Sequence, residues 1–362
     1  AHADLQVNTS LGTYEGVDYK GVEVFRGIPF AEDPAGELRF APPKKAKSFS
    51  GIYKADMFCK LPYQAALMHT DGKNTNNDSC LCLNIYRKKG TTSSSRLPVY
   101  VWIYGGAYAV GASNSPTFEG VSFANHDIIF VSFNYRLGAE GFLSSRITRE
   151  LYGTTGNWGH LDMLMALQWV HDHISDFGGD PDRVTVGGES AGAYSASALI
   201  LSDKAKGLFK RAILESGTLI SFPIYGFSTE YNRTYAMEHS LKLLQQFHID
   251  DSQKGLEKLR ALDPVLLAFH CGYDYDLSTN RGTFMMPYLD GEVLPSDPYR
   301  QLVSGGFNDV DVLLGYNTDE GTLFVDPLIS EASFYSGIER AFPGKVADEL
   351  KSLYAVDAEH SA

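Results

Sequence analysis

The chain has 362 residues and a formal net charge of −13 at pH 7, so it is long enough for one large α/β domain or two smaller ones with a substantial core. The acidic balance argues against binding to nucleic acid, because the phosphate backbone repels a negative surface. No apolar run approaches the ~20 residues of a membrane span. The four cysteines include no C-x-x-C pair and no His/Cys cluster, which argues against a zinc site.

Short strand-like pieces separated by Gly and Pro fill the first 45 or so residues and predict a small antiparallel N-terminal sheet. These pieces are LQVNTS, GTYEG and VEVFRGIPF. Apolar strand patterns then alternate with helical ones, which indicates an α/β protein with a mostly parallel central sheet covered by helices on both faces. We expect a single domain over residues 1–362, with a helical insertion at about 222–280. The expected strands are LCLNIYR, LPVYVWIYGG, IIFVSFNYR, RVTVGG, FKRAILESG and DVDVLLGYN, and the expected helices include 162–177 and AGAYSASALILS.

The stretch VTVGGESAG runs from a strand through two glycines to a serine and then into a helix. G-x-S-x-G in this setting is typical of a nucleophile elbow, a sharp turn that exposes the serine hydroxyl at the edge of a sheet. Gly188 and Gly192 would provide the room that such a turn needs. The alternative is a glycine-rich turn with an incidental serine at Ser190.

A second glycine stretch, WIYGGAY at residues 102–108, also follows an apolar strand. Acyl transfer builds negative charge on a carbonyl oxygen, and backbone N–H groups must meet that charge. Glycines allow the backbone to approach closely. The stretch is therefore a candidate oxyanion loop, and the alternative is an ordinary turn that ends a strand.

Several longer motifs occur together with these two stretches and in a fixed order. The chain resembles the type-B carboxylesterase/lipase family, which includes carboxylesterases, cholinesterases and fungal lipases and has the α/β-hydrolase fold. The resemblance extends from VEVFRGIPFAEDP to about residue 324 and rests on WIYGGAY, NYRLGAEGFL, GNWGHLDMLMALQWV, FGGDPDRVTV, GESAG and GYNTDEGT.

The resemblance implies a serine hydrolase of carboxylic esters that works through an acyl-enzyme and needs no cofactor and no metal. Ser190 matches the nucleophile, and Glu320 matches the acid that orients the catalytic histidine. Gly106, Ala107 and Ala191 match the donors of the oxyanion hole. Alanine replaces a usual glycine at position 107 but keeps its N–H group, so we expect the hole to function.

The resemblance also pairs Cys59 with Cys80 in a disulfide and leaves Cys82 as a buried free thiol. Cys271 is then left over, and a bridge between Cys82 and Cys271 is not expected.

Glycosylation sequons occur at Asn8, Asn77 and Asn232, and Asn77 lies in a polar stretch just before a cysteine. We expect a secreted protein or one of the secretory pathway, because disulfides form in oxidising compartments.

The catalytic histidine is not found in this chain. In the family it follows the acid, but the only histidine after Glu320 is His360, which lacks the glycine-flanked setting of that residue. We therefore expect the C-terminal part of the fold to be absent from this chain. Three explanations remain open: a complementary C-terminal chain or missing segment supplies the base, the chain is truncated, or the protein uses another base or none.

Substrate class is predicted only in part. Twenty residues separate Cys59 from Cys80, which is short for the lid of a related lipase, so a carboxylesterase of soluble esters is favoured over a lipase. The alternative from another class is a non-catalytic, cholinesterase-like adhesion protein, but such proteins typically lack the serine that this chain has.

Overall fold

The computed structural model describes residues 5–64, 78–218, 232–271, 285–323, 329–342 and 344–356. Within these ranges the chain forms eleven α-helices and eleven strands, together with short 3₁₀-helices. None of the described helices combines the length and the apolar character that crossing a lipid bilayer requires.

An eight-stranded sheet forms the centre of the molecule, with the strand order β11-β10-β9-β7-β8-β6-β4-β3. The five strands from β11 to β8 are parallel, whereas β6, β4 and β3 pair antiparallel to their neighbours. Every strand expected after residue 80 is found. The strands are β3 (Val17–Tyr19), β4 (Val22–Pro29), β6 (Cys82–Lys88), β7 (Leu97–Ile103), β8 (Ile129–Phe133), β9 (Gly179–Glu189), β10 (Arg211–Glu215) and β11 (Asp311–Gly315).

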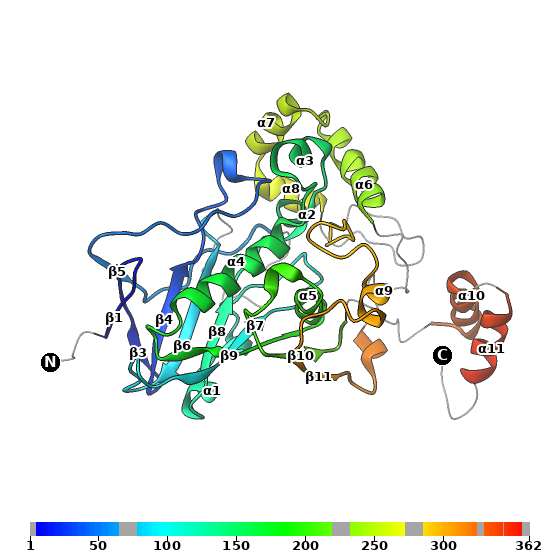
Figure 1. The fold of residues 1–362 in the computed structure, drawn as a ribbon. Helices are drawn as coiled ribbons and strands as arrows, with labels where there is room; N and C mark the ends of the chain where they lie inside the picture. The colour runs from blue at the N-terminus through cyan, green and yellow to red at the C-terminus, as the bar shows by residue number, and fades with distance from the viewer. Residues whose placement is uncertain are drawn as a thin grey trace.

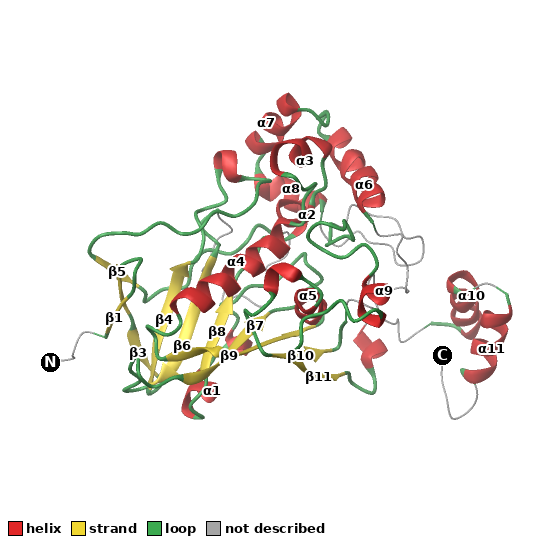
Figure 2. Cartoon of the chain, viewed as in Figure 1, coloured by secondary structure: helices red, strands yellow, loops and turns green. Residues whose placement is uncertain are grey.

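Helices cover both faces of this sheet, as Figures 1 and 2 show. On one face, α4 (Trp158–His173) and α5 (Ala191–Ile200) pack over the larger apolar core. On the other face, α1 (Val121–Asn125) packs on β4, β6 and β8 over a smaller cluster that includes Tyr86 and Phe130. The α/β-hydrolase arrangement expected from the sequence is therefore confirmed.

The small N-terminal sheet is present, but it is mixed rather than antiparallel. β1 (Gln6–Asn8) pairs antiparallel with β2 (Thr13–Glu15), whereas β5 (Ile52–Lys54) joins β2 in parallel. The segment VEVFRGIPF was expected in this sheet and instead forms β4 of the central one. Its side chains are buried on both faces, which suits an inner strand of a covered sheet.

Helices fill the described part of the 222–280 region. They are α6 (Arg233–Gln246), α7 (Gln253–Ala261) and α8 (Pro264–His270), and they lie beside the short helices α2 (Gly138–Phe142) and α3 (Arg146–Tyr152) at one end of the molecule (Figure 1). Residues 219–231 and 272–284 fall outside the described ranges, so the helical insertion and the single domain remain predictions.

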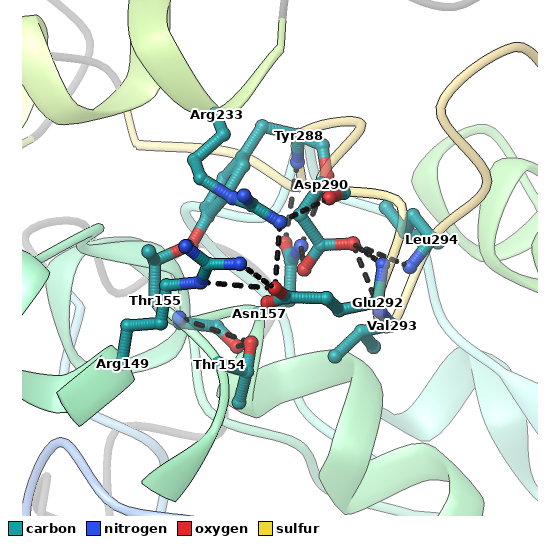
Figure 3. A network of polar contacts seen from close by, with 11 residues as sticks. Arg149, Thr154, Thr155, Asn157, Arg233, Tyr288, Asp290, Glu292, Val293 and Leu294 are labelled. Atoms are coloured by element: carbon teal, nitrogen blue, oxygen red, sulfur yellow. Dashed lines mark hydrogen bonds and ion pairs between the residues drawn. The ribbon is translucent and has the colours of Figure 1, made fainter. Parts of the chain in front are cut away.

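A polar network ties these helices to the loop at 288–294 (Figure 3). Oε1 of Glu292 forms ion pairs with the Nη2 atoms of Arg149 of α3, at 2.8 Å, and Arg233 of α6, at 2.7 Å. Buried Asp290 accepts three backbone N–H groups of the loop and one bond from the Asn157 amide. Two cationic helix residues are thus held on one loop, which fixes α3 and α6 relative to each other.

All five residues of β11, at one end of the sheet, are exposed. Leu313 and Leu314 are 66% and 59% exposed, and the aromatic ring of Tyr316 follows them into solvent. Within the described residues, β11 pairs only with β10, so its other edge is open. Beyond it, α9 (Pro298–Val303) lies near the sheet, whereas α10 (Glu331–Ala341) and α11 (Lys345–Leu353) pack on each other and stand apart (Figure 1).

The expected disulfide partner of Cys59 is wrong. Cys59 bonds to Cys82, with their Cα atoms 6.4 Å apart, and Cys80 is a buried free thiol. The chain turns tightly here, because the Cys82 N–H donates to the Cys80 carbonyl. This turn carries the Cys80 thiol toward the buried Arg136–Asp162 ion pair and leaves Cys82 at the start of β6 beside Cys59. Cys271 is a buried free thiol, and Cys82 is bonded to Cys59, so Cys271 and Cys82 are not bridged, as expected.

Candidate active site

Ser190 occupies the turn between β9 and α5 with backbone angles of φ 52° and ψ −121°. This region is strained for a residue with a side chain, and such strain is found at functional turns. The neighbouring glycines are required by contact: a Cβ on Gly192 would lie 2.0 Å from the carbonyl oxygen of Ile103, and one on Gly188 would lie 2.5 Å from the backbone of Gly192. The turn therefore has the form of a nucleophile elbow.

The loop after β7 lies directly against this turn. A Cβ on Gly105 would be 3.1 Å from the Cβ of Ser190 and 2.6 Å from the carbonyl oxygen of Glu189. The loop bends sharply, with φ of 117° at Gly106 and 55° at Ala107. The two stretches that the sequence singled out are thus brought together.

Three backbone N–H groups near Ser190 have no acceptor within the described part of the chain. They belong to Gly106 and Ala107 of the loop and to Ala191, the first residue of α5. The N–H groups of a first helical turn carry partial positive charge. The arrangement supplies unpaired donors on both sides of the serine, as an oxyanion site requires.

Glu320 lies in the turn after β11 and is tied to the strand beside the elbow. One carboxylate oxygen accepts hydrogen bonds from the Ser216 hydroxyl and, at 2.8 Å, from the Asn317 N–H. The bond from Ser216, followed by those from Asn317, lowers the pKa of Glu320 below its usual range. The carboxylate is therefore ionised near neutral pH and is exposed enough to receive a further donor.

Ser216 belongs to a second sharp turn, at the end of β10. Its φ is 56°, and its N–H donates to the Gly315 carbonyl of β11 at 2.8 Å. The next residue, Gly217, is close to the elbow, because a Cβ there would lie 2.8 Å from the Ser190 carbonyl oxygen. The Glu215 carbonyl accepts the Ser190 N–H at 2.9 Å. The turn at Ser216 therefore contacts both the candidate nucleophile, Ser190, and the candidate acid, Glu320.

Two further carboxylates lie at the same edge. Glu189 and Glu215 are direct neighbours in the parallel register of β9 and β10. Partial removal from water, and then the like charges of Glu215 and Glu320, raise the pKa of Glu189. The site is consequently rich in negative charge, which would stabilise a cation placed among these groups.

No histidine of the described residues hydrogen-bonds to Ser190 or Glu320. His160 is fully buried in the first turn of α4, and burial lowers its pKa to about 4. His171 and His173 lie at the other end of that helix. His360 falls outside the described residues, so the expectation about it stays a prediction.

Sequence reasoning missed Ser216 and Glu215. Both β9 and β10 end in a glutamate that is followed by a serine and, within three residues, by a glycine. These residues are Glu189, Ser190 and Gly192 after β9 and Glu215, Ser216 and Gly217 after β10. That local similarity was a usable signal. The bond between Ser216 and Glu320, however, joins residues 104 positions apart and depends on the pairing of β10 with β11.

The predicted sequons differ in their setting. Asn8 is an exposed residue of β1 whose side-chain oxygen accepts the Thr13 hydroxyl at 2.7 Å. Asn232 caps α6 by accepting the N–H groups of Thr234 and Tyr235. Asn77 lies outside the described residues. Of the described pair, Asn8 is the more accessible.

Comparisons with known proteins agree with this geometry. The chain is 33% identical to the para-nitrobenzyl esterase of Bacillus subtilis over 96% of its own length and 70% of the relative's. It is 36% identical to carboxylesterase 1C of Rattus norvegicus, of which it spans 56%. The chain thus spans little more than half of that mammalian relative.

Solved structures give the same result. A structure titled PNB esterase superposes with a TM-score of 0.81 at 31% identity, over 99% of this chain and 73% of the other. The structure of a carboxylesterase of Geobacillus stearothermophilus superposes with a TM-score of 0.82 at 31% identity, over 98% of this chain and 71% of the other. The family model described as "Carboxylesterase family" matches residues 3–352. The chain therefore belongs to the carboxylesterase family.

Proposed function

We propose that this chain carries the nucleophile, the oxyanion hole and the acid of a serine carboxylesterase. The observation that carries the proposal is the position of Ser190, which lies in a strained elbow against a loop whose N–H groups are unpaired. Ester hydrolysis by a serine needs both features, because the attack creates an oxyanion that must be stabilised where it forms.

The reaction follows from this geometry. The Ser190 oxygen attacks the ester carbonyl carbon while a base removes the hydroxyl proton, and the carbonyl π electrons move to the oxygen. The N–H groups of Gly106, Ala107 and Ala191 hold that oxyanion. As the tetrahedral intermediate collapses, the base returns the proton to the departing alcohol. Water then repeats the sequence on the acyl-enzyme, releasing the acid and free Ser190.

Glu320 orients the base and stabilises it when it is protonated. Its lowered pKa supports this role, since an ionised carboxylate is needed. The bonds from the Ser216 hydroxyl and the Asn317 N–H use the same carboxylate oxygen of Glu320, so the other oxygen can accept an imidazole N–H.

The base is best supplied by polypeptide outside the described residues, which would also cover β11. Two observations support this: Glu320 has no described histidine partner, and the apolar side chains of Leu313 and Leu314 are exposed. Apolar patches of this kind mark surfaces that another segment covers. Mass spectrometry of the protein purified from its source, reduced and non-reduced, tests this. A species larger than the 362-residue chain, or a co-purifying fragment with histidine, is expected.

The esterase proposal is tested by hydrolysis of 4-nitrophenyl butyrate with the protein purified in the form its source produces. Ser190→Ala should lower kcat/KM by about 10³-fold or more. The control Ser197→Ala removes a serine of α5, the helix that follows Ser190, whose hydroxyl donates to the Tyr194 carbonyl, and it should change kcat/KM only a few-fold. A fluorophosphonate probe should label Ser190. Ordinary turnover in Ser190→Ala would contradict the proposal.

Soluble esters are the proposed substrates. The relatives named above are esterases, and none of them is named a lipase. Turnover of 4-nitrophenyl butyrate should exceed that of micellar 4-nitrophenyl palmitate. Absence of probe labelling in an otherwise folded protein would favour the non-catalytic adhesion class instead.

We also propose a secreted glycoprotein. The Cys59–Cys82 bond favours an oxidising compartment, and Asn8 is exposed. Treatment with an amidase that removes N-linked glycans should increase electrophoretic mobility, and Asn8→Gln should remove part of that shift. No shift would argue against glycosylation.

A further inference from the structure

Two consecutive residues of the loop at 104–111, after β7, have left-handed backbone conformations although neither is a glycine. The φ angles are 55° at Ala107 and 59° at Tyr108. This conformation is strained for a residue with a Cβ, so it persists only where the surroundings hold it. Gly106 and Ala107 carry two of the N–H groups assigned to the oxyanion hole. The position of these donors therefore depends on what holds Tyr108.

The side chain of Tyr108 is buried and reaches α5. Its hydroxyl lies 3.1 Å from the Oγ atom of Ser195, which also bonds the Ala191 carbonyl at 2.8 Å. A carbonyl oxygen can only accept, so Ser195 gives its single proton to Ala191 and can receive the proton of Tyr108. Burial raises the pKa of Tyr108, so its hydroxyl keeps that proton.

These hydrogen bonds join the two sides of the oxyanion hole. They run from the Tyr108 hydroxyl through the Oγ atom of Ser195 to the carbonyl of Ala191. Tyr108 directly follows Ala107, a donor on the side of the loop, and Ala191 carries the N–H donor on the side of the helix. A misplacement of about 1 Å in a catalytic site can lower the rate roughly a hundredfold, so a link between the two sets of donors matters for the reaction.

Other contacts hold the same loop but tie it to different parts of the molecule. The Tyr108 carbonyl accepts the Gly138 N–H of α2 at 2.8 Å, and its ring packs edge-on against Phe142 of that helix. Gly111 exchanges two hydrogen bonds of 3.0 Å with the Gln64 amide. Loss of the Tyr108 hydroxyl would therefore leave the loop in place and would change its alignment with α5.

We propose that Tyr108 and Ser195 are positioning residues, whose hydroxyl pair aligns the N–H donors of the loop with the N–H donor of Ala191. Both side chains are buried, so they act through the backbone groups that they hold and not by touching the substrate. The inference rests on the proposed function, because it assigns a role within that site. The expected effect is on the transition state, where the oxyanion forms.

The test measures steady-state hydrolysis of 4-nitrophenyl butyrate by the same form of the protein as above. Tyr108→Phe keeps the ring and removes the hydroxyl. Both kcat and kcat/KM should fall by the same factor, about three- to tenfold, and KM should stay unchanged. A trifluoromethyl ketone forms a tetrahedral oxyanion on the Ser190 oxygen and so resembles the transition state. Its inhibition constant should rise by the same factor.

The matched control Tyr288→Phe removes another buried tyrosine hydroxyl, which lies 2.7 Å from the Thr155 hydroxyl outside the candidate active site. It should lower the urea midpoint about as much as Tyr108→Phe does but leave kcat and KM unchanged. Ser195→Ala removes the partner of Tyr108. In that background, Tyr108→Phe should cause no further loss of kcat, because the bond is already broken.

Hydrogen exchange of the loop gives a readout that does not depend on activity. The N–H groups of Ala109 and Val110 donate to the Gly106 carbonyl, so a loosened loop would exchange them faster. Peptides covering 104–111 should exchange faster in Tyr108→Phe than in the wild type or in Tyr288→Phe.

The possible failures can be told apart. An active wild type with unchanged kcat in Tyr108→Phe would overturn the positioning role, and so would an equal loss of kcat in Tyr288→Phe. A wild-type protein that a fluorophosphonate probe does not label would instead contradict the proposed function. In that case unchanged exchange in Tyr108→Phe would still overturn the link between the loop and α5.

Discussion

Gly192→Ala would insert one methyl group where α5 meets β7. The new Cβ would lie 2.0 Å from the Ile103 carbonyl oxygen and 2.8 Å from its carbon. Ordinary van der Waals contact begins at about 3.4 Å, so an overlap of more than 1 Å must be relieved. The atoms in the way are backbone atoms of β7, which is held between β8 and β9 and cannot rotate aside.

Two effects of opposite sign determine the result. Alanine is better than glycine in a helix by about 1 kcal/mol, which favours the variant. Forcing an extra carbon into a packed core costs about 1–3 kcal/mol and occasionally more. The overlap with immobile backbone favours the upper end of that range, so we expect a net loss of about 2 kcal/mol in the free energy of unfolding.

Urea unfolding followed by tryptophan fluorescence measures this difference. The matched control is Gly337→Ala in α10, another helical glycine, where an added Cβ would meet nothing within 4 Å. The control should be as stable as the wild type or more stable by up to about 1 kcal/mol. If Gly192→Ala were as stable as Gly337→Ala, α5 could not lie against β7 as described, and the steric explanation of the elbow glycines would fail.

Three other predictions follow from the site and the core. Cys82→Ser should lower the free energy of unfolding by about 3 kcal/mol, because the disulfide to Cys59 is lost. Cys80→Ser should keep this disulfide in a non-reduced peptide map. A map of the wild-type protein with Cys80 bonded to Cys59 would contradict the assignment. The pKa of His160 is about 4 in the folded state and ~6.5 in the unfolded state. The free energy of unfolding should therefore keep its full value above pH 6.5 and fall by about 3 kcal/mol as the pH drops toward 4. His160→Gln should flatten that pH dependence in urea titrations, and an unchanged slope would refute it. Ser216→Ala should lower kcat/KM about tenfold and raise the lower pKa of the pH–rate profile, since Glu320 loses a donor; an unshifted profile would count against this link.

Local sequence patterns predicted the elements that hold the nucleophile. The run of β-branched residues before Gly188, the small residues after Ser190 and the glycines at 105–106 each describe a turn within a few positions. Turns of this kind depend on nearby residues, so their form could be derived without knowing the rest of the chain.

The features that were missed depend on distant contacts or on the path of a single turn. Cys80 and Cys82 are two residues apart, and the tight turn between them decides which thiol faces Cys59. The contact of Ser216 with Glu320 needs the parallel pairing of β10 and β11. The segment 22–29 was placed in the wrong sheet because its burial on both faces only becomes visible once β6 lies beside it.

The open edge of β11 has a consequence for how this chain behaves in concentrated solution. Where no other segment covers this edge, two copies can pair the backbones of their β11 strands about a two-fold axis, which places Leu313 and Leu314 of each strand on opposite faces of the joined sheet. The opposite edge, β3, is short and carries Asp18, which is paired with Lys89, so it does not offer a matching apolar strand. Self-association through β11 would therefore stop at a closed pair and would not continue into a filament.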